Sequence, residues 1–293
     1  MFKKYLIKLS YELMIKMLLS KNYIKSQVST ALQEDLGLLG DITSQATIAE
    51  NHKSSAEIIL KEDAVLCGID FAILTFKLLD RKIKIKKQKK DGLKFKKGSS
   101  ILKIYGNTQA ILAGERTALN FLGLMSGIAT KAQKYSEIAK KYGSKIYSTR
   151  KTIVGIRELQ KYALSIGGAN INRMSLDDFF FIKDNHISKA DNIIDTIDQV
   201  RMFYPKKKIT VEVDKISQLK KILDQKIDVV LLDNMNVSQI KKCLKLINNK
   251  FECEASGNVN LKNLNEIAKT GVHRISTGQL THSVNNVDFG LEL

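Results

Sequence analysis

The stretch STRKTIVGIRELQKYALSIGGANINRMSLDDFFFIKDNHI, residues 148–187, carries the pattern that decides the fold. An apolar run at each end of it predicts a strand, and each strand leads into cationic residues. The first leads into Arg150 and Lys151, the second leads into Lys183, and Arg173 follows the glycine turn between them. Because Arg and Lys gathered away from water are costly unless an anion lies among them, the stretch predicts one wall of an anion-binding site.

Apolar runs of this kind recur through the second half of the chain, each followed by a helical stretch. Such alternation is typical of repeated βα units and a parallel sheet. In a βα barrel the carboxyl ends of the strands share one face, where the chemistry takes place. Six runs fall short of the usual eight strands, so we predict an incomplete, about six-stranded α/β barrel, with an open doubly wound sheet as the alternative. The runs are Lys145–Thr149, Phe179–Ile182, Ile209–Val213, Asp228–Leu232, Phe251–Ala255 and His273–Ser276.

The first half of the chain has a different pattern, with short strands separated by Gly and Asp turns. It predicts an α+β sandwich domain with an antiparallel sheet. Asp41 and the three residues after it read as a polar turn. The expected strands are Ser55–Leu60, Val65–Gly68, Lys82–Gln88 and Ile101–Tyr105, and the expected helices are Tyr23–Asp35, Asp70–Asp80 and Ala113–Gly127.

These patterns predict four segments. Residues 1–20 form a dispensable N-terminal extension, residues 21–126 the sandwich domain, residues 127–283 the catalytic barrel, and residues 284–293 a tail that returns to the N-terminal domain.

Composition limits the partners. Lys and Arg number 48 against 30 Asp and Glu, a formal net charge of +18, which suits nucleic acid, an acidic membrane or small anions. The lysines are scattered rather than striped, which favours a lysine-rich surface over a nucleic-acid-binding protein. No apolar run approaches the ~20 residues that cross a bilayer. Cys67, Cys243 and Cys253 lack metal-ligand spacing and indicate buried thiols in a reducing, cytoplasmic compartment.

The residues that follow the strands divide by charge. Glu212 and Asp233 are anionic, and two carboxylates beside a phosphate suit Mg²⁺. The small residues of Ser256–Asn258 and Thr277–Gln279 allow backbone N–H groups to face a phosphate. His282 follows the second of these turns and is a candidate ligand contact. The pattern therefore predicts a phosphorylated, metal-bound donor that meets a carboxylate-bearing acceptor held by the cations.

Each of these residues has a simpler interpretation. An Arg or Lys after a strand is commonly a solvated loop charge, and a lone His such as His186 is commonly a structural residue bonded to backbone. Glu212 and Asp233 could cap the following helices. Asp214 and Asn234 are better cap candidates, which leaves the two carboxylates free to point inward. The agreement of all these groups at one predicted rim favours a functional site.

Nine motifs in order resemble the quinolinate phosphoribosyltransferase family, the carboxylating nicotinate-nucleotide pyrophosphorylases of NAD biosynthesis. The resemblance runs from about residue 25 to the end, and the combination of TRKT, KDNH and EASGN is highly specific. The motifs are EDLGLLGDIT (34–43), GERTALNFL (114–122), TRKT (149–152), the KYAL–GGA–NR segment (161–173), IKDNHI (182–187), VEVD (211–214), LLDNM (231–235), EASGN (254–258) and TGQLTHS (277–283).

The resemblance implies a homodimer, or a hexamer of such dimers, whose N-terminal domain closes the partner's site. It implies that Arg116 reaches the neighbouring subunit's substrate, that Lys151, Glu212 and Asp233 are catalytic, and that Glu212 and Asp233 hold Mg²⁺ with the phosphoribosyl pyrophosphate. The implied substrate-binding residues are Arg116, Thr149, Arg150, Lys151, Arg173, Lys183, Glu212, Asp233, Ser256, Gly257, Asn258, Thr277, Gly278, Gln279 and His282.

The implied reaction transfers the phosphoribosyl group of 5-phosphoribosyl 1-pyrophosphate to quinolinate with decarboxylation. Two departures from the family pattern lie near the predicted site. Ile153-Val154-Gly155 replaces Thr-Pro-Gly after TRKT, and Asn172 stands where the family has His. Asn donates a hydrogen bond but carries no charge, so another pyridine carboxylate such as nicotinate is the alternative acceptor.

Overall fold

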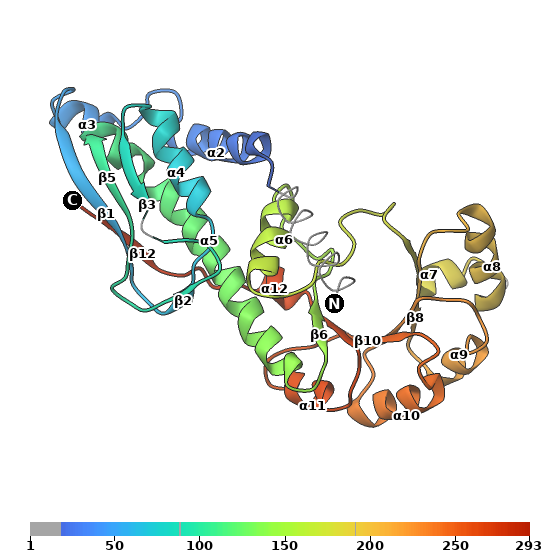
Figure 1. Cartoon of the computed structure of the whole chain (residues 1–293). Coiled ribbons are helices and arrows are strands. Elements are labelled where there is room, and N and C mark those ends of the chain that lie inside the picture. Colours follow the sequence, from blue (N-terminus) through green and yellow to red (C-terminus); the bar gives the residue numbers. More distant parts are fainter. Residues whose placement is uncertain (1–18, 88, 191) are drawn as a thin grey trace, which may run out of the picture. The chain divides into compact units, whose positions relative to one another are not determined.

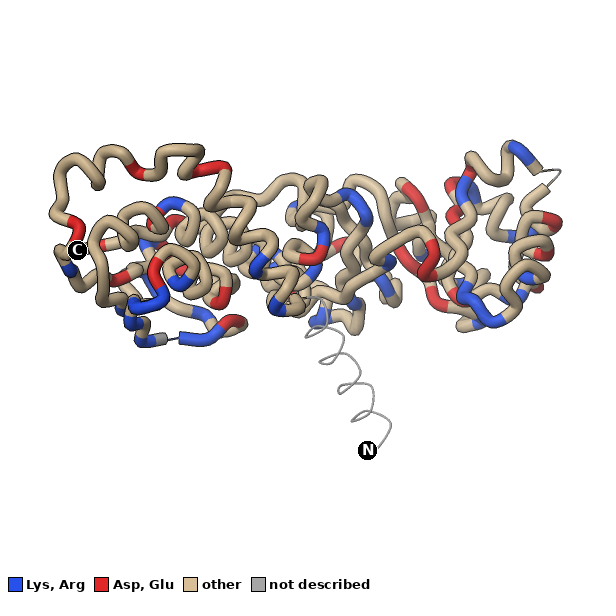
Figure 2. Tube along the Cα trace, turned by 90° about the horizontal axis from the view of Figure 1, so that it is seen from above, with Lys and Arg blue, Asp and Glu red and all other residues tan. Residues whose placement is uncertain are grey.

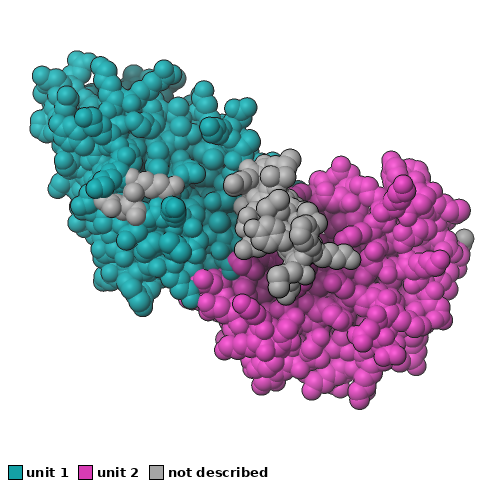
Figure 3. Space-filling view, viewed as in Figure 1, with its two compact units in different colours: residues 1–131, 156–167, 284–293 teal, residues 132–155, 168–283 magenta. Residues whose placement is uncertain are grey.

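The computed structural model describes residues 19–87, 89–190 and 192–293 (Figure 1). The N-terminal extension expected over residues 1–20 therefore lies outside the described residues except at its end. The chain divides into two compact units that interleave along the sequence (Figure 3). Unit 1 contains the described residues up to Lys131 with Ile156–Gly167 and Val284–Leu293, and unit 2 contains Ala132–Gly155 and Gly168–Ser283.

Unit 1 is built on a four-stranded sheet in the order β12-β1-β5-β3, in which every neighbouring pair is antiparallel. The antiparallel sheet expected for the first half of the chain is confirmed. A second, two-stranded sheet pairs β2 with β4. The strands are β1 (Lys53–Leu60), β2 (Ala64–Val65), β3 (Lys84–Lys87), β4 (Lys94–Phe95), β5 (Ser100–Asn107) and β12 (Phe289–Glu292).

The core of unit 1 lies between this sheet and two helices, α4 (Ile69–Leu79) and α5 (Thr108–Lys140). Buried side chains alternate along β1, so that one face of the strand supplies Ala56, Ile58 and Leu60. Helix α4 adds Phe76, which is fully buried. The other helices of this unit are α2 (Lys21–Leu36), α3 (Ile42–Thr47) and α6 (Arg157–Ile166).

Three local expectations for unit 1 are wrong. The residues after Asp41 form α3 rather than a turn, because the Asp41 carboxylate accepts the Ser44 N–H at 3.0 Å and caps a helix. The strand expected over Val65–Gly68 ends at Val65. Helix α5 continues past Gly127, where the sequence predicts its end. A Cβ at Gly127 would lie 2.2 Å from the Asn285 carbonyl oxygen, so this glycine serves close packing and not termination.

Unit 2 is built on a six-stranded sheet in the order β6-β11-β10-β9-β8-β7, in which every neighbouring pair is parallel. All six expected strands are present. The described residues include no ladder between the edge strands β6 and β7, so the barrel is incomplete, as expected. The strands are β6 (Lys145–Tyr147), β7 (Phe180–Ile182), β8 (Ile209–Val213), β9 (Val229–Asp233), β10 (Glu252–Ser256) and β11 (Arg274–Ser276).

Helices lie on the outer side of the curved sheet of unit 2 (Figure 1). Strand residues that face them, such as Val230 and Cys253, are fully buried. Their neighbours along each strand point to the inner side, which is where the candidate site lies. The helices are α7 (Asp184–Ile187), α8 (Ile193–Phe203), α9 (Ile216–Lys221), α10 (Val237–Ile247), α11 (Leu264–Ala268) and α12 (Gln279–His282).

The charged residues are spread over the described part of the chain. Figure 2 shows Lys and Arg positions spread over the trace rather than gathered in one stripe. None of the helices in the described part of the chain has the length and apolar character that a membrane span requires.

Candidate active site

A pocket of about 670 Å³ lies at the carboxyl ends of the strands of unit 2. This volume is in the range typical of small-molecule sites. The pocket brings together the site residues that the sequence predicts within the barrel. They are Thr149, Arg150, Lys151, Arg173, Lys183, Glu212, Asp233, Ser256, Gly257, Asn258, Thr277, Gly278, Gln279 and His282.

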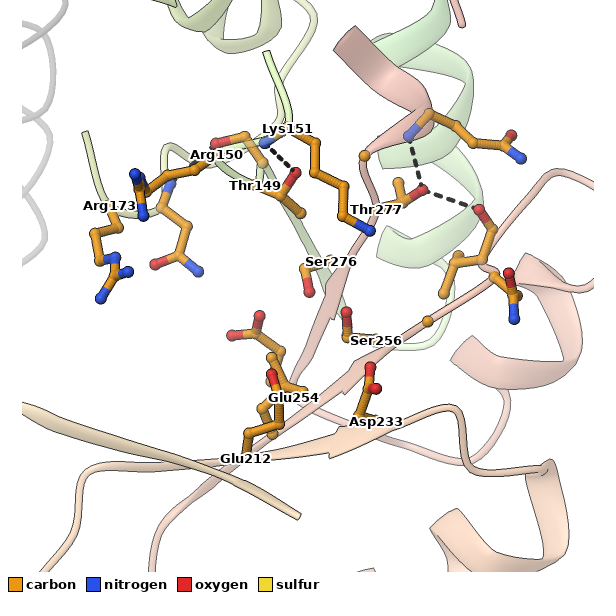
Figure 4. Close-up of a pocket in the computed structure, with 18 of the residues that line it drawn as sticks. Thr149, Arg150, Lys151, Arg173, Glu212, Asp233, Glu254, Ser256, Ser276 and Thr277 are labelled. Atoms are coloured by element: carbon orange, nitrogen blue, oxygen red, sulfur yellow. Dashed lines mark hydrogen bonds between the residues drawn. The ribbon is translucent and has the colours of Figure 1, made fainter. Parts of the chain in front are cut away.

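The cationic wall of the pocket comes from the loop after β6, the segment before β7 and the end of β7 (Figure 4). The Arg173 guanidinium lies over the Phe181 ring, 5.2 Å from its centroid, and Lys183 Nζ lies 4.9 Å from the same centroid. Burial lowers the pKa of Arg173, and the neighbouring Arg150 lowers it further. Asp178 opposes these effects, and an anion bound beside the two guanidinium groups would offset their repulsion further.

Lys151 crosses the pocket from the loop after β6 toward the turn at Thr277 (Figure 4). Its backbone N–H donates to the Thr149 hydroxyl at 3.2 Å, and its carbonyl accepts from Thr281. A Cβ at Gly278 would lie 3.0 Å from Lys151 Cδ and 2.9 Å from the His282 ring. The glycine therefore leaves the space that the lysine and the histidine occupy.

The two predicted carboxylates lie on adjacent strands, Glu212 on β8 and Asp233 at the end of β9. Glu212 Oε2 accepts a charge-assisted bond from Lys183 Nζ at 2.7 Å, and Asp233 accepts from the Asn234 side-chain amide at 2.8 Å. Neither carboxylate caps a helix. The sequence analysis favours Asp214 and Asn234 as the helix caps, and this expectation is wrong. The residue that caps α10 is Asn236, and the residue at the N-cap position of α9 is Lys215.

The turn after β10 has a backbone that few side chains would permit. Gly257 has φ +89, and a Cβ there would lie 2.2 Å from the Asn234 side-chain oxygen. Asn258, at φ 51, donates from its side-chain amide to the same oxygen at 3.0 Å. This close packing fixes the turn beside Asp233, where its backbone lines the pocket.

The turn after β11 is organised by Thr277. Its hydroxyl donates to the Val259 carbonyl at 2.9 Å and accepts the Gln279 N–H at 3.2 Å. The threonine side chain is therefore committed to holding the turn, and Gly278 contributes the pocket surface through its backbone.

The histidines divide as the sequence suggests. His186 Nδ1 accepts the Lys183 N–H at 3.0 Å, His52 bonds Thr108, and His273 accepts the Cys253 N–H. His282 alone among these lines the pocket, with its Nδ1 2.7 Å from the Ser283 hydroxyl. Arg116 lies elsewhere: it is an exposed residue of α5 in unit 1 and does not line this pocket.

Sequence reasoning missed several lining residues, notably Ser276 and Phe181, and it placed Glu254 at the end of its strand without giving it a role. Each of these residues lies on a strand, two residues before a residue that the sequence did identify. Because alternate strand residues share a face, Ser256 implies Glu254 and Lys183 implies Phe181. Side-chain alternation was the available signal.

Glu254 is the most unusual of these residues, since only 1% of it is exposed. Its Oε2 lies 2.9 Å from Nε of Arg274, its register partner on β11. Burial raises the pKa of Glu254, and the nearby Arg274 opposes this effect.

Comparisons with known proteins agree over nearly the whole chain. The family model described as quinolinate phosphoribosyl transferase, C-terminal domain, matches residues 128–292, and the model of the N-terminal domain matches residues 41–126. The chain is 37% identical to tobacco (Nicotiana tabacum) quinolinate phosphoribosyltransferase (decarboxylating) 2b, mitochondrial, over 92% of this chain and 82% of that protein. It is 36% identical to the chloroplastic nicotinate-nucleotide pyrophosphorylase (carboxylating) of Arabidopsis thaliana, with the same coverage.

Solved structures give the same result. The nicotinate-nucleotide pyrophosphorylase of Ehrlichia chaffeensis is 38% identical with a TM-score of 0.89, covering 94% of this chain and 98% of that one. The corresponding protein of Francisella tularensis is 35% identical with a TM-score of 0.89, covering 94% and 97%.

Proposed function

The chain belongs to the quinolinate phosphoribosyltransferase family, and from this premise we propose that it converts quinolinate to nicotinate mononucleotide in NAD biosynthesis. The phosphoribosyl group comes from 5-phosphoribosyl 1-pyrophosphate, and pyrophosphate and carbon dioxide are released. One observation carries the proposal: a single pocket combines a cationic wall, two carboxylates on adjacent strands and two turns of small residues.

The cationic wall is suited to quinolinate, a pyridine with two adjacent carboxylates. Arg150 and Arg173 offer planar forks that match carboxylate geometry, and Lys151 and Lys183 add point charges. Lys183 is already paired with Glu212 at 2.7 Å, so it can be shared between that carboxylate and the substrate. Most of the protein's contribution to this half of the site is positioning of the ring nitrogen.

The donor half of the site is formed by the turns Ser256–Asn258 and Thr277–Gln279, whose backbones would face the phosphate. Glu212 and Asp233 fit Mg²⁺, since this ion prefers one or two carboxylates and completes its shell with substrate oxygens and water. When bound, Mg²⁺ would neutralise charge on the departing pyrophosphate.

The chemistry follows from this arrangement. The quinolinate nitrogen attacks the anomeric carbon of the ribose as pyrophosphate leaves, and positive charge develops on the sugar. Glu212 and Asp233 stabilise that charge electrostatically from fixed positions. The ring nitrogen, now quaternary, withdraws electrons from the adjacent ring carbon, which loses its carboxylate as carbon dioxide.

The direct experiment mixes the purified protein with quinolinate, 5-phosphoribosyl 1-pyrophosphate and Mg²⁺. We expect nicotinate mononucleotide and pyrophosphate in equal amounts, and no product when Mg²⁺ is removed by chelation. Failure to form the mononucleotide under these conditions contradicts the proposal.

Nicotinate is the second candidate acceptor, because Asn172 lines the cationic side of the pocket without a charge. Its backbone N–H donates to the Ser148 hydroxyl at 3.1 Å, which holds the residue at the pocket wall. Competition between the two acids decides between them. We expect quinolinate to win, since its second carboxylate uses the additional cations, and a clear nicotinate preference reverses the assignment.

The proposal includes a homodimer in which Arg116 of the partner subunit completes each site. Its support is that Arg116 is an exposed cation of α5 and does not line the pocket of its own chain. The proposal also places the protein in the cytoplasm, supported by Cys67, Cys243 and Cys253, which are buried free thiols as expected in a reducing compartment.

A further inference from the structure

The aromatic residues at β7 have no part in the chemistry above. Alternate residues of a strand share a face, so Phe179, Phe181 and Lys183 point to the same side. The centroids of the Phe179 and Phe181 rings are 6.3 Å apart, and Phe181 lines the pocket. Phe180 points to the other side, where its ring centroid lies 6.2 Å from that of Tyr204. A pocket wall that otherwise carries charge therefore includes the face of an aromatic ring.

Arg173 lies over both inward-facing rings of this strand. Its guanidinium is 5.7 Å from the centroid of the Phe179 ring and 5.2 Å from that of Phe181. At such distances a cation is attracted to the negative face of an aromatic ring.

The guanidinium of Arg173 makes no hydrogen bond or ion pair with the part of the chain that the structure describes. Asp178 attracts it, but the oxygens of Asp178 accept the N–H groups of Met174 and Ser175 at 2.5 and 3.4 Å. The rings hold the guanidinium through its flat face, and a guanidinium carries its five donors in its plane. All of these donors therefore stay open to a ligand.

The other cations of the wall do not depend on the rings in this way. Lys183 Nζ lies 4.9 Å from the Phe181 centroid, but it is also paired with Glu212 at 2.7 Å. Arg150 lies beside Arg173 and repels it (Figure 4). The backbone of Arg173 has φ 28, which side chains other than glycine rarely adopt. Arg173 is therefore held in a strained conformation beside a like charge, and the rings supply the attraction that opposes both effects.

The proposed function gives this arrangement a use, and the inference rests on that function. Ordering a long side chain when a ligand binds costs free energy, so a cation that is already in place binds a carboxylate more tightly. A guanidinium held by its face keeps its planar fork open to the carboxylate.

We propose that Phe181 is a positioning residue, which holds the Arg173 guanidinium over its ring so that Arg173 can bind a carboxylate of quinolinate. Phe179 supplies the second ring face. Phe181 acts through Arg173 and takes no part in bond making or breaking.

The sharpest experiment replaces Phe181 with trifluorophenylalanine, which keeps the shape of the side chain and removes most of the negative potential of the ring face. The Michaelis constants for the two substrates are measured separately. We expect the KM for quinolinate to rise by about tenfold, as for loss of a partly desolvated cation–π contact. The KM for 5-phosphoribosyl 1-pyrophosphate should stay within about twofold of the wild type, because the phosphate-facing turns are untouched. A quinolinate KM that also stays within about twofold contradicts the proposal, since shape alone then accounts for the residue.

Natural side chains give a second test with a matched control. Phe181→Leu should raise the KM for quinolinate as the fluorinated residue does, and Phe181→Tyr should restore it, because tyrosine keeps the ring face. Phe180→Leu removes a ring from the opposite face of the same strand and does not line the pocket, so it should leave this KM unchanged. An equal rise in Phe180→Leu and Phe181→Leu overturns the proposal in favour of general packing of β7.

A double-mutant cycle tests whether Phe181 acts through Arg173. In an Arg173→Ala chain, Phe181→Leu should raise the KM for quinolinate by less than about twofold, because the residue that it positions is already gone. A full tenfold rise in that chain, about the effect expected in the wild type, excludes Arg173 as the intermediary.

The outcomes separate this inference from the proposed function. A wild type that forms no nicotinate mononucleotide overturns the proposed function and the inference together. An active wild type whose quinolinate KM is insensitive to fluorination of Phe181 overturns the inference alone.

Discussion

The sheets of the two units carry similar side chains but place them differently. In unit 1, β1 ends at Leu60, and the charged residues that follow pair at the surface, such as Lys61 with Glu292 and Asp63 with Lys96. In unit 2, Glu212 and Asp233 lie at the ends of neighbouring strands and face one pocket. Antiparallel strands send successive ends to opposite edges of a sheet, whereas parallel strands send every carboxyl end to the same edge. Strand direction, more than composition, therefore concentrates charge into a site.

This comparison predicts a separation of effects. Substitutions in the sheet-helix core of unit 1 should change stability, and substitutions at the strand ends of unit 2 should change activity. The predictions that follow test that separation, and the third is designed to break it.

The largest expected effect is on stability, for Phe76→Ala in unit 1. Phe76 is fully buried in the core cluster, and its ring packs where α4 meets Gly114 of α5. We expect the free energy of unfolding to fall by about 3–5 kcal/mol, through lost burial and the cavity that remains. Urea denaturation measures it, and kcat per folded molecule should stay at the wild-type value.

Leu78→Ala on the same helix is the control, since Leu78 is 38% exposed. It should cost clearly less than Phe76→Ala, because a smaller side chain is removed from a position that is only partly buried. A comparable loss in both variants would mean that helix propensity, and not the core, is being measured.

The second effect is on activity, for Lys151→Ala in unit 2. Lys151 lines the pocket, and the hydrogen bonds that fix its position are made by its backbone N–H and carbonyl. Removing the side chain keeps these bonds, so the fold should persist. We expect kcat/KM to fall by about 100-fold or more, since a substrate carboxylate loses its cation. Lys250→Ala removes a surface lysine that pairs with Asp224 in the same unit and should be without effect. Normal turnover in Lys151→Ala contradicts the role given to this residue.

The third effect would break the separation, because it puts activity in unit 1. Arg116→Ala should lower kcat/KM by about tenfold or more without changing stability, if Arg116 of the partner subunit holds substrate. Lys140→Ala removes an exposed cation from the last turn of the same helix and is the matched control.

Subunit mixing tests where Arg116 acts. When Arg116→Ala and Lys151→Ala subunits exchange freely, half of the dimers are mixed, and one of their two sites has both residues intact. Activity should therefore return to about a quarter of the wild-type value. Recovery of none, with mixed dimers demonstrated, would place both residues in one chain's site.

The sequence predicts unit 2 well for a physical reason. One face of this parallel sheet packs against helices and is buried, so Ile209, Val211 and Val213 are apolar and the strand Ile209–Val213 is found at its observed bounds. The charged and small residues after each run also identify most of the pocket. Thr277 lines the pocket as expected, but its hydroxyl is committed to the turn, which only the contact with Val259 reveals.

What the sequence could not predict depends on contacts between distant segments. The interior pair of Glu254 and Arg274 reads as two ordinary charged strand residues until β10 and β11 are placed side by side. The sequence does not predict the full length of α5, because Gly127 resembles a helix end. Gly127, like Gly123 inside the predicted helix, instead accommodates the chain at residues 285–287. Such residues satisfy tertiary packing at the expense of local propensity.

The smallest expected effect separates two buried acids, Asp91 of unit 1 and Glu254 of unit 2. Burial raises the pKa of both. Asp91, however, accepts the N–H groups of Gly68 and Ile69 at 2.9 and 3.2 Å and the Tyr162 hydroxyl at 3.1 Å. Its oxygens are committed to the start of α4, so we expect a structural role and no effect of Asp91→Asn on carbon dioxide release.

The raised pKa of Asp91 predicts the direction in which the free energy of unfolding changes with pH, and this direction can be measured. Because its folded pKa is above its unfolded value of ~3.9, ionisation is harder in the folded state, and stability is lost as pH rises from the unfolded toward the folded pKa. Asp91→Asn should flatten that slope, at a cost of about 1 kcal/mol for a weakened cap.

Asp63, whose pKa is lowered by Lys96 and Lys97, should do the reverse, since its contribution to stability is lost as pH falls. Urea denaturation of both Asn variants between pH 3 and 7, the range spanned by ordinary carboxyl titration, measures the two slopes. The two substitutions should change the pH slope of the free energy of unfolding in opposite directions relative to the wild type. Changes of the same sign would mean that surface charge, and not burial, governs Asp91.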